Sequence, residues 1–153
     1  MARSERRSDR MRSIEAISVR ESQDLAGQME RQAQVVRDAE QRLQELASYL
    51  DSYAAEQAEK SQAGGVSAMQ LTETHLFLEK LRHAVNLQAE TVEKARSHYE
   101  SCRAKWIAQH VRSSALGSAV HRFEEEEAQA LRKREERIQD EVAARFHRTE
   151  KPG

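Results

Sequence analysis

Residues 71–123 read LTETHLFLEKLRHAVNLQAETVEKARSHYESCRAKWIAQHVRSSALGSAVHRF. Mostly apolar or small side chains recur along this stretch at alternating steps of three and four residues, which is the 3.5-residue period of a coiled-coil seam. The seam positions are Leu71, Thr74, Leu78, Leu81, Val85, Gln88, Val92, Ala95, Tyr99, Cys102, Trp106, Gln109, Ser113, Leu116, Val120 and Phe123. The stretch holds no proline and one glycine, so the pattern predicts one helix about 80 Å long. Because such a helix cannot bury its stripe on itself, it needs a partner helix.

The first half of the chain carries a matching stripe. Its strict part comprises Leu25, Met29, Gln32, Val36, Ala39, Leu43, Leu46, Leu50 and Tyr53. Before it the stripe begins at Met11 and Ile14, and two successive four-residue steps from Glu21 to Met29 predict a stutter that relaxes the supercoil locally. We therefore expect a first helix over about residues 10–62.

The strongest break in the chain lies between the two stripes, at residues 62–65, which read QAGG. Gly64 can adopt the left-handed conformation that ends a helix, and Ser67 with Gln70 has the spacing of a capping box that starts one. The loop is therefore expected at 63–66 and a second helix at about 67–146. A loop this short between two long amphipathic helices favours an antiparallel hairpin. The expected fold is all-α, a long antiparallel two-helix coiled coil formed by residues 1–153 as one unit.

The C-terminal part of the second helix should extend beyond the first. The first helix is expected to run out near residue 120 of the second, and the strict period is lost after Phe123. Residues 124–146 keep only widely spaced apolar side chains among many charges. We interpret this segment as a helix that overhangs the hairpin without a partner, which in water would be marginally stable.

Composition limits the class of function. One third of the 153 residues are charged, the net charge is −1, and neither a membrane-spanning run nor the apolar core of a signal peptide is found. The single cysteine excludes an internal disulfide framework. These features predict an intracellular coiled-coil protein without direct membrane insertion.

No residue pattern for catalysis is found. The sequence lacks a phosphate-binding glycine loop, a nucleophile elbow and a metalloprotease motif. His98 and Cys102 share one helical face, but two ligands do not make a zinc site, so Cys102 is interpreted as a small buried seam residue. We expect no enzyme activity, no catalytic residue, no metal and no cofactor.

Five arginines lie in residues 3–12: Arg3, Arg6, Arg7, Arg10 and Arg12. They can form a solvated arm or an arm that docks on an acidic protein surface. A nucleic-acid-binding arm is a third reading, but interleaved aromatic residues are lacking and the chain as a whole has no basic field.

Aromatic residues gather near the loop. Tyr53 is on the seam, whereas Tyr49 and Phe77 are one position off it and should lie near one another in a hairpin; Ala84 lies off the seam on the same flank. Large apolar residues outside a seam are exposed, and a cluster of them indicates a contact site. The alternative is that they only widen a poorly filled seam.

Four features occur in a fixed order. They are LASYLDSY at 46–53, GGVS at 64–67, FLEKL at 77–81 and Trp106. This order resembles the FliJ family of flagellar type III export proteins, in which a tyrosine pair spaced by four, a short Gly/Ser loop, a Phe-Leu-x-x-Leu segment and a later tryptophan recur. The resemblance covers about residues 11–146.

The resemblance implies a coiled coil similar to the central stalk of rotary ATPases. Its termini would enter the hexameric ring of the export ATPase, and its loop half would contact the membrane protein of the export gate and handle export chaperones. The implied gate contacts are Arg42, Leu46, Tyr49, Tyr53, Phe77, Leu81, Ala84 and Gln88. The ring contacts expected from this arrangement are Arg3, Arg6, Arg7, Arg10, Arg12, Leu131, Arg134 and Ile138.

The resulting hypothesis is a non-enzymatic stalk and adaptor of flagellar protein export, which promotes assembly of the ATPase ring and couples it to the gate. Such a protein would be cytoplasmic in a bacterium and peripheral at the cytoplasmic face of the inner membrane, with no nucleic-acid partner. Two alternatives stay open: the stalk counterpart of an injectisome, and a general structural coiled coil without an ATPase partner.

Overall fold

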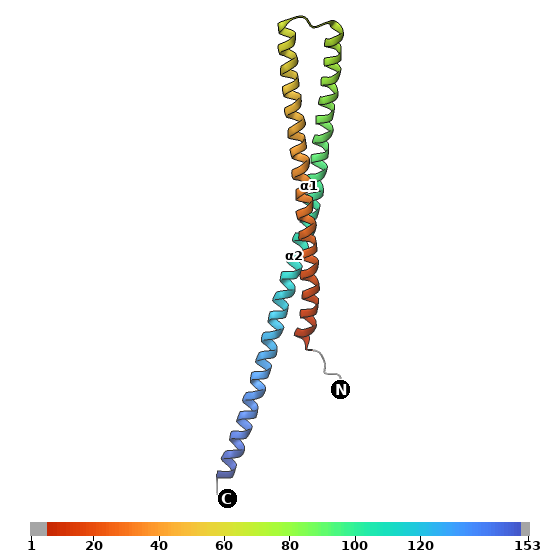
Figure 1. Ribbon diagram of the computed structural model, residues 1–153. Coiled ribbons are helices and arrows are strands. Elements are labelled where there is room, and N and C mark those ends of the chain that lie inside the picture. The colour runs from red at the N-terminus through yellow and green to blue at the C-terminus, as the bar shows by residue number, and fades with distance from the viewer. Residues whose placement is uncertain (1–5, 151–153) are drawn as a thin grey trace. The chain divides into compact units, whose positions relative to one another are not determined.

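The computed structural model describes residues 6–150, which form two long helices joined by a short loop (Figure 1). Helix α1 spans Arg7–Ala63 and helix α2 spans Ala68–Glu150, and no strand occurs among the described residues. The fold is an all-α antiparallel hairpin, as the two seams predicted. Helix α1 begins before and ends just after the expected 10–62, whereas α2 begins one residue after the expected start at 67 and ends four residues beyond 146.

The loop between the helices has the predicted chemistry. Gly64 and Gly65 have φ of 82° and 84°, in the left-handed region that side chains with a Cβ rarely adopt. The backbone N–H of Gln70 donates to Ser67 Oγ at 3.1 Å, and the Ser67 N–H donates to Gln70 Oε1 at 3.0 Å. These reciprocal bonds are the capping box expected at the start of α2.

The chain divides into two compact units. Among the described residues, the loop unit contains residues 24–107, and the terminal unit contains residues 6–23 and 108–150. Each helix contributes to both units. The two units differ in what fills the seam between α1 and α2.

In the loop unit the seam is mainly apolar. Its most buried side chains are Ala39, Leu78, Leu81, Val92 and Ala95, all at predicted seam positions. Leu71, near the loop, is the only predicted seam position of this unit whose side chain is exposed.

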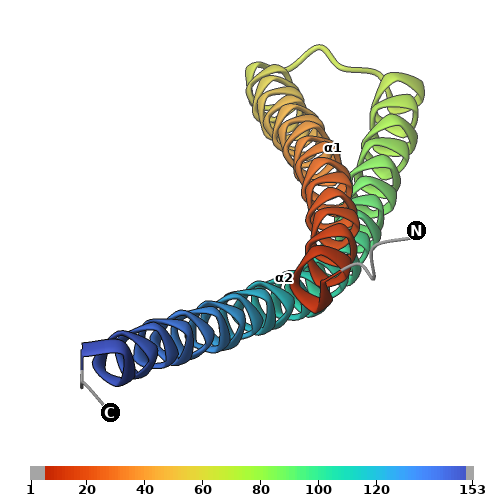
Figure 2. The ribbon, with the colours of Figure 1, turned by 90° about the horizontal axis from the view of Figure 1, so that it is seen from below.

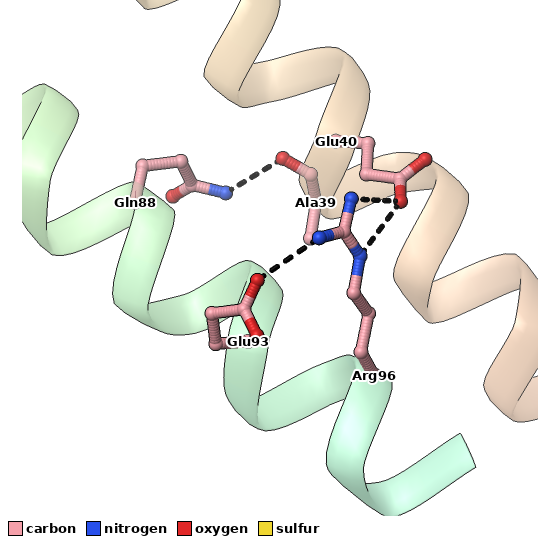
Figure 3. Close-up of polar contacts among 5 residues, drawn as sticks. All are labelled: Ala39, Glu40, Gln88, Glu93 and Arg96. Carbon is pink, nitrogen blue, oxygen red and sulfur yellow. Dashed lines mark hydrogen bonds and ion pairs between the residues drawn. The ribbon is translucent and has the colours of Figure 1, made fainter. Parts of the chain in front are cut away.

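Two glutamines of this seam are paired with backbone. Gln32 Nε2 donates to the carbonyl of Ala95 at 3.2 Å, and Gln88 Nε2 donates to the carbonyl of Ala39 at 3.0 Å (Figure 3). These cross-helix bonds satisfy polar groups that would otherwise be costly within the seam. They also fix the antiparallel register, because a later residue of α1 meets an earlier residue of α2.

In the terminal unit the seam of α1 is built from small polar residues. Ser8, Ser18 and Ser22 are buried, whereas Ile14 and Ile17 are exposed. The stripe predicted to begin with Ile14 is therefore wrong. The covered positions of α1 keep alternating steps of three and four: Ser8, Met11, Glu15, Ser18, Ser22, Leu25 and Met29. The predicted stutter is also wrong, because Ser22 and not Glu21 is covered, so the steps to Leu25 and Met29 are three and four residues.

The pairing of the two helices ends later than expected. Ser8 donates to Glu127 from its N–H at 3.2 Å and from its hydroxyl at 2.6 Å, and Arg12 binds Glu124. Helix α1 thus reaches residue 127 of α2 and not only residue 120. All side chains of residues 128–149 are exposed, and this overhang continues beyond the start of α1 (Figure 1, Figure 2).

Candidate functional site

Three aromatic rings form a cluster in the loop unit. Tyr53 sits half-buried in the seam and contacts two neighbours: the Tyr49 ring is stacked with centroids 6.3 Å apart, and the Phe77 ring meets it edge-on at 4.8 Å. Tyr49 is 52% exposed and Phe77 is 38% exposed. Tyr49 and Phe77 are therefore brought together as predicted, with Tyr53 between them, and both leave apolar area open to solvent.

An open groove begins at this cluster and extends to the loop. It is lined by Tyr53 and Phe77, by Lys60 and Glu73, and by the backbone around Gly64. Its lining combines apolar rings with one charge of each sign. Gln57, Gln70 and Thr74 add further polar groups to the lining, so the groove combines aromatic and polar surface.

The other predicted gate residues differ in accessibility. Arg42 is exposed, Leu46 and Ala84 are half-buried, and Leu81 is buried. Gln88 is half-buried and its amide binds the Ala39 carbonyl. Within the set only Arg42, Tyr49 and Phe77 are exposed, so these three can meet a partner without rearrangement of the seam.

The start of α1 and the overhang form a second candidate site, in the terminal unit. A groove there is lined by Arg6, Arg12, Leu131 and Arg134, among others, so the structure brings four predicted ring contacts together. Arg10 is exposed on α1, and Ile138 is exposed farther along the overhang. Arg3 lies outside the described residues.

Two arginines of this site are held by contacts within the chain. The Arg12 guanidinium binds Glu124, and this hydrogen bond raises the pKa of Arg12. Arg7 lies over the Phe123 ring, 5.2 Å from its centroid, at a distance suited to a cation–π contact.

Glu127 closes the site on the α2 side. The two hydrogen bonds donated by Ser8 stabilise its carboxylate and lower its pKa. The acidic run at residues 124–127, just before the overhang, is therefore partly used to fix the first turn of α1.

A partly buried polar network in the terminal unit was not predicted from the sequence. The hydroxyls of Ser18 and Ser113 are 2.8 Å apart, and Gln109 Nε2 donates to Ser18 Oγ at 2.9 Å and to Glu21 Oε2 at 3.1 Å. Ser113 and Gln109 had been assigned to the seam, but Ser18 had not. Ser18 lies seven residues before Leu25, and this heptad spacing could have identified it as a seam residue.

The described residues show neither a metal site nor a membrane span. Among residues 6–150, no group of three or more His, Cys, Asp or Glu side chains is placed to hold a metal ion. Cys102 is half-buried, in line with its interpretation as a seam residue. No helix in the described part of the chain is long and apolar enough to cross a membrane.

The comparison with protein families gives one finding that bears on identity. The family model described as Flagellar FliJ protein matches residues 7–151, nearly the whole chain. Comparison with curated proteins gives no match, and neither does comparison with solved structures. The match spans both helices, the loop and the overhang, and it agrees with the motif order read from the sequence. The chain therefore belongs to the FliJ family, whose role is in flagellar type III protein export.

Proposed function

We propose that this protein is a non-enzymatic stalk and adaptor of the flagellar export apparatus. In this proposal it promotes assembly of the export-ATPase ring and couples the ring to the export gate and to export chaperones. The observation that carries the proposal is the family match over residues 7–151, because it includes both candidate contact sites. We place the protein in the bacterial cytoplasm, peripheral to the inner membrane.

The terminal site supports a ring contact. An isolated helix of about twenty residues is only marginally stable in water unless charge pairs or a partner support it. Residues 128–149 have no covering element within the described chain and carry the apolar residues Leu131 and Ile138 beside Arg134. A ring interior would cover this helix and bind its charged flanks.

The aromatic cluster supports a gate contact. Exposed aromatic area beside an open groove gains stabilisation when a partner covers it. Tyr49 and Phe77 present this area from both helices, and Tyr53 holds their rings in place. The loop half thus offers a preformed surface to a gate protein or a chaperone.

The decisive experiment is to measure ATP hydrolysis by a hexameric export ATPase with and without the purified protein. We expect hydrolysis to rise, because a stalk that enters the ring favours the assembled hexamer. No change with an ATPase shown to be competent would favour a structural coiled coil without an ATPase partner.

Two further comparisons separate the alternatives. Stronger stimulation of an injectisome ATPase than of a flagellar one would favour the injectisome counterpart. Salt-sensitive binding to single-stranded or duplex nucleic acid would favour an arginine arm that contacts phosphates, because such contacts weaken as salt rises.

A further inference from the structure

The overhang of α2, residues 128–149, carries an apolar stripe that no other part of the described chain covers. Its large members are Leu131, Ile138, Val142 and Phe146, each between 54% and 68% exposed. Ala128, Leu131, Ile138 and Val142 fall on one repeat of three- and four-residue steps, completed by Glu135 and Arg145. This repeat is shifted by one residue from the seam that α2 uses within the hairpin. Ala128 and Leu131, at its near end, also line the groove at the start of α1, and the rest of the stripe is available to a second helix.

The charges beside this stripe alternate at heptad spacing. Glu127, Arg134, Glu141 and Arg148 lie seven residues apart on one flank, with signs that alternate along the helix. Flanking charges set the orientation and partner choice of coiled coils. In an antiparallel pair of identical helices each flank meets the same flank of its partner, so an alternating flank can complement itself.

We propose that the overhang pairs with the overhang of a second copy of this chain, as a short antiparallel coiled coil. In this pair Leu131 packs opposite the partner's Val142, and Arg134 lies beside the partner's Glu141. The two-fold symmetry repeats each contact. Glu127 and the partner's Arg148 form the outer pair, since a carboxylate has enough lone-pair sites to accept from both Ser8 and an arginine.

The charges select one register. If one helix slides by a heptad in one direction, Arg134 meets the partner's Arg134 and Glu127 meets Glu141 of the partner subunit. A slide in the other direction brings Arg134 to the partner's Arg148 and Glu141 to the partner's Glu141. Both alternatives place like charges together, which is unfavourable at close range. A parallel pair forms fewer charge pairs, because there this flank meets the opposite flank, where Arg132 can pair with Glu127 but Gln139 and Phe146 carry no charge.

The pair should be weak and reversible. Glu135 occupies a central position of the stripe, and a polar residue at such a position fixes register at a cost in stability. The inference goes beyond the proposed function and does not depend on it. Since the same helix is proposed to enter the ATPase ring, self-pairing and ring binding would exclude one another.

The first test is the molar mass of the full chain by sedimentation equilibrium over a wide range of concentration. We expect the mean mass to rise from 17.5 kDa toward twice that value. The Ile138→Glu variant should raise the dimer dissociation constant at least about tenfold, because in this register residue 138 lies opposite the partner's Glu135 and the new carboxylate would face a like charge. The matched control is Val111→Glu, an exposed apolar position of α2 outside the stripe, which should leave the constant unchanged.

The second test uses charge reversal and is specific for the antiparallel register. Arg134→Glu alone and Glu141→Arg alone should each weaken self-association several-fold, since each places two pairs of like charges across the interface. An equimolar mixture of the two variants should associate again, because the mixed pair restores opposite charges at both places. Circular dichroism confirms that all variants keep their helix content.

Three outcomes would overturn the proposal. The chain could stay monomeric at every concentration, which would leave the stripe to a different protein. A dimer could form that Ile138→Glu does not affect, which would place the interface elsewhere. Finally, failure of the mixture to recover would reject this register.

Discussion

The substitution Tyr49→Ala tests most directly whether the Tyr49 ring is a contact surface for a partner or part of the core of the hairpin. Tyr49 is 52% exposed and touches the Tyr53 ring, so the hairpin should lose about 1 kcal/mol when the ring is removed. Leu81 is 9% exposed in the seam, and Leu81→Ala should cost about 3 kcal/mol through lost burial and the gap left behind. Phe77→Ala should be intermediate, near 2 kcal/mol, because Phe77 is 38% exposed and its ring meets Tyr53 edge-on.

Thermal unfolding and affinity for the export-gate protein should be measured on the same variants. At about 2–4 °C per kcal/mol for a chain of this size, Leu81→Ala lowers the Tm by roughly 6–12 °C and Tyr49→Ala by only roughly 2–4 °C. Gate affinity should follow the opposite order for these two, with a loss of about fivefold for Tyr49→Ala, since the exposed half of the ring is worth about 1 kcal/mol when covered.

The control is Val35→Ala, a half-exposed apolar residue of α1 outside the aromatic cluster, which should change gate affinity little. If Tyr49→Ala melted as low as Leu81→Ala, the ring would belong to the core. If gate affinity stayed at the wild-type value, the contact assignment would be wrong.

Three further predictions concern the terminal unit. Deletion of residues 128–153 should abolish ring binding in a pull-down and leave the helix content of the remaining hairpin intact; retained binding would move the docking site elsewhere. Ser8→Ala should destabilise the first turn of α1 at neutral pH. Ser8 lowers the pKa of Glu127, so their hydrogen bonds stabilise the folded protein fully above the unfolded pKa of 4.5. This stabilisation is lost as pH falls through the lower folded pKa of Glu127. The acid unfolding curves of the wild type and the Ser8→Ala variant should therefore converge there. Gly117→Ala should raise the free energy of unfolding by up to about 1 kcal/mol in a urea titration, because alanine favours a helix more than glycine does. The new Cβ would lie 3.1 Å from Glu15 Oε1, which is the movable end of a side chain. A lower free energy of unfolding would show that Glu15 cannot move.

Much of the fold could be predicted because the loop unit obeys simple rules. Leu78, Leu81 and Val92 repeat at coiled-coil spacing, and Gly64 with Ser67 marks where one helix ends and the next begins. Each of these features acts over a few residues of sequence. Local rules of this kind can be read without knowledge of the partner helix.

The terminal unit departed from the prediction because its seam depends on pairing between distant residues. Ser18 alone looks like a surface residue, and it becomes a seam residue only because Ser113 and Gln109 from α2 satisfy its hydroxyl. Ile14 looked like a seam residue by hydropathy, but the alternation of four and three that runs back from Met29 through Leu25 and Ser18 reaches Glu15 and not Ile14. Spacing was therefore a better guide than hydropathy at this end of α1.

The candidate sites were predictable to different degrees for the same reason. Tyr49 meets the Tyr53 ring because the two residues are four apart on one helix, and Phe77 meets it because Tyr53 and Phe77 lie at nearly equal distances from the short loop. The use of Glu127 and Glu124 to hold Ser8 and Arg12 was not predicted, because the first helix was expected to run out near residue 120 of the second. Helix phase selects these two of the four carboxylates: Glu127 continues the three-and-four spacing from Val120 and Phe123, and Glu124 directly follows Phe123. The remaining acidic residues, Glu125 and Glu126, are exposed, and Glu125 Oε1 lies 3.1 Å from His121 Nε2 of the same helix, so neither carboxylate is needed to hold the start of α1.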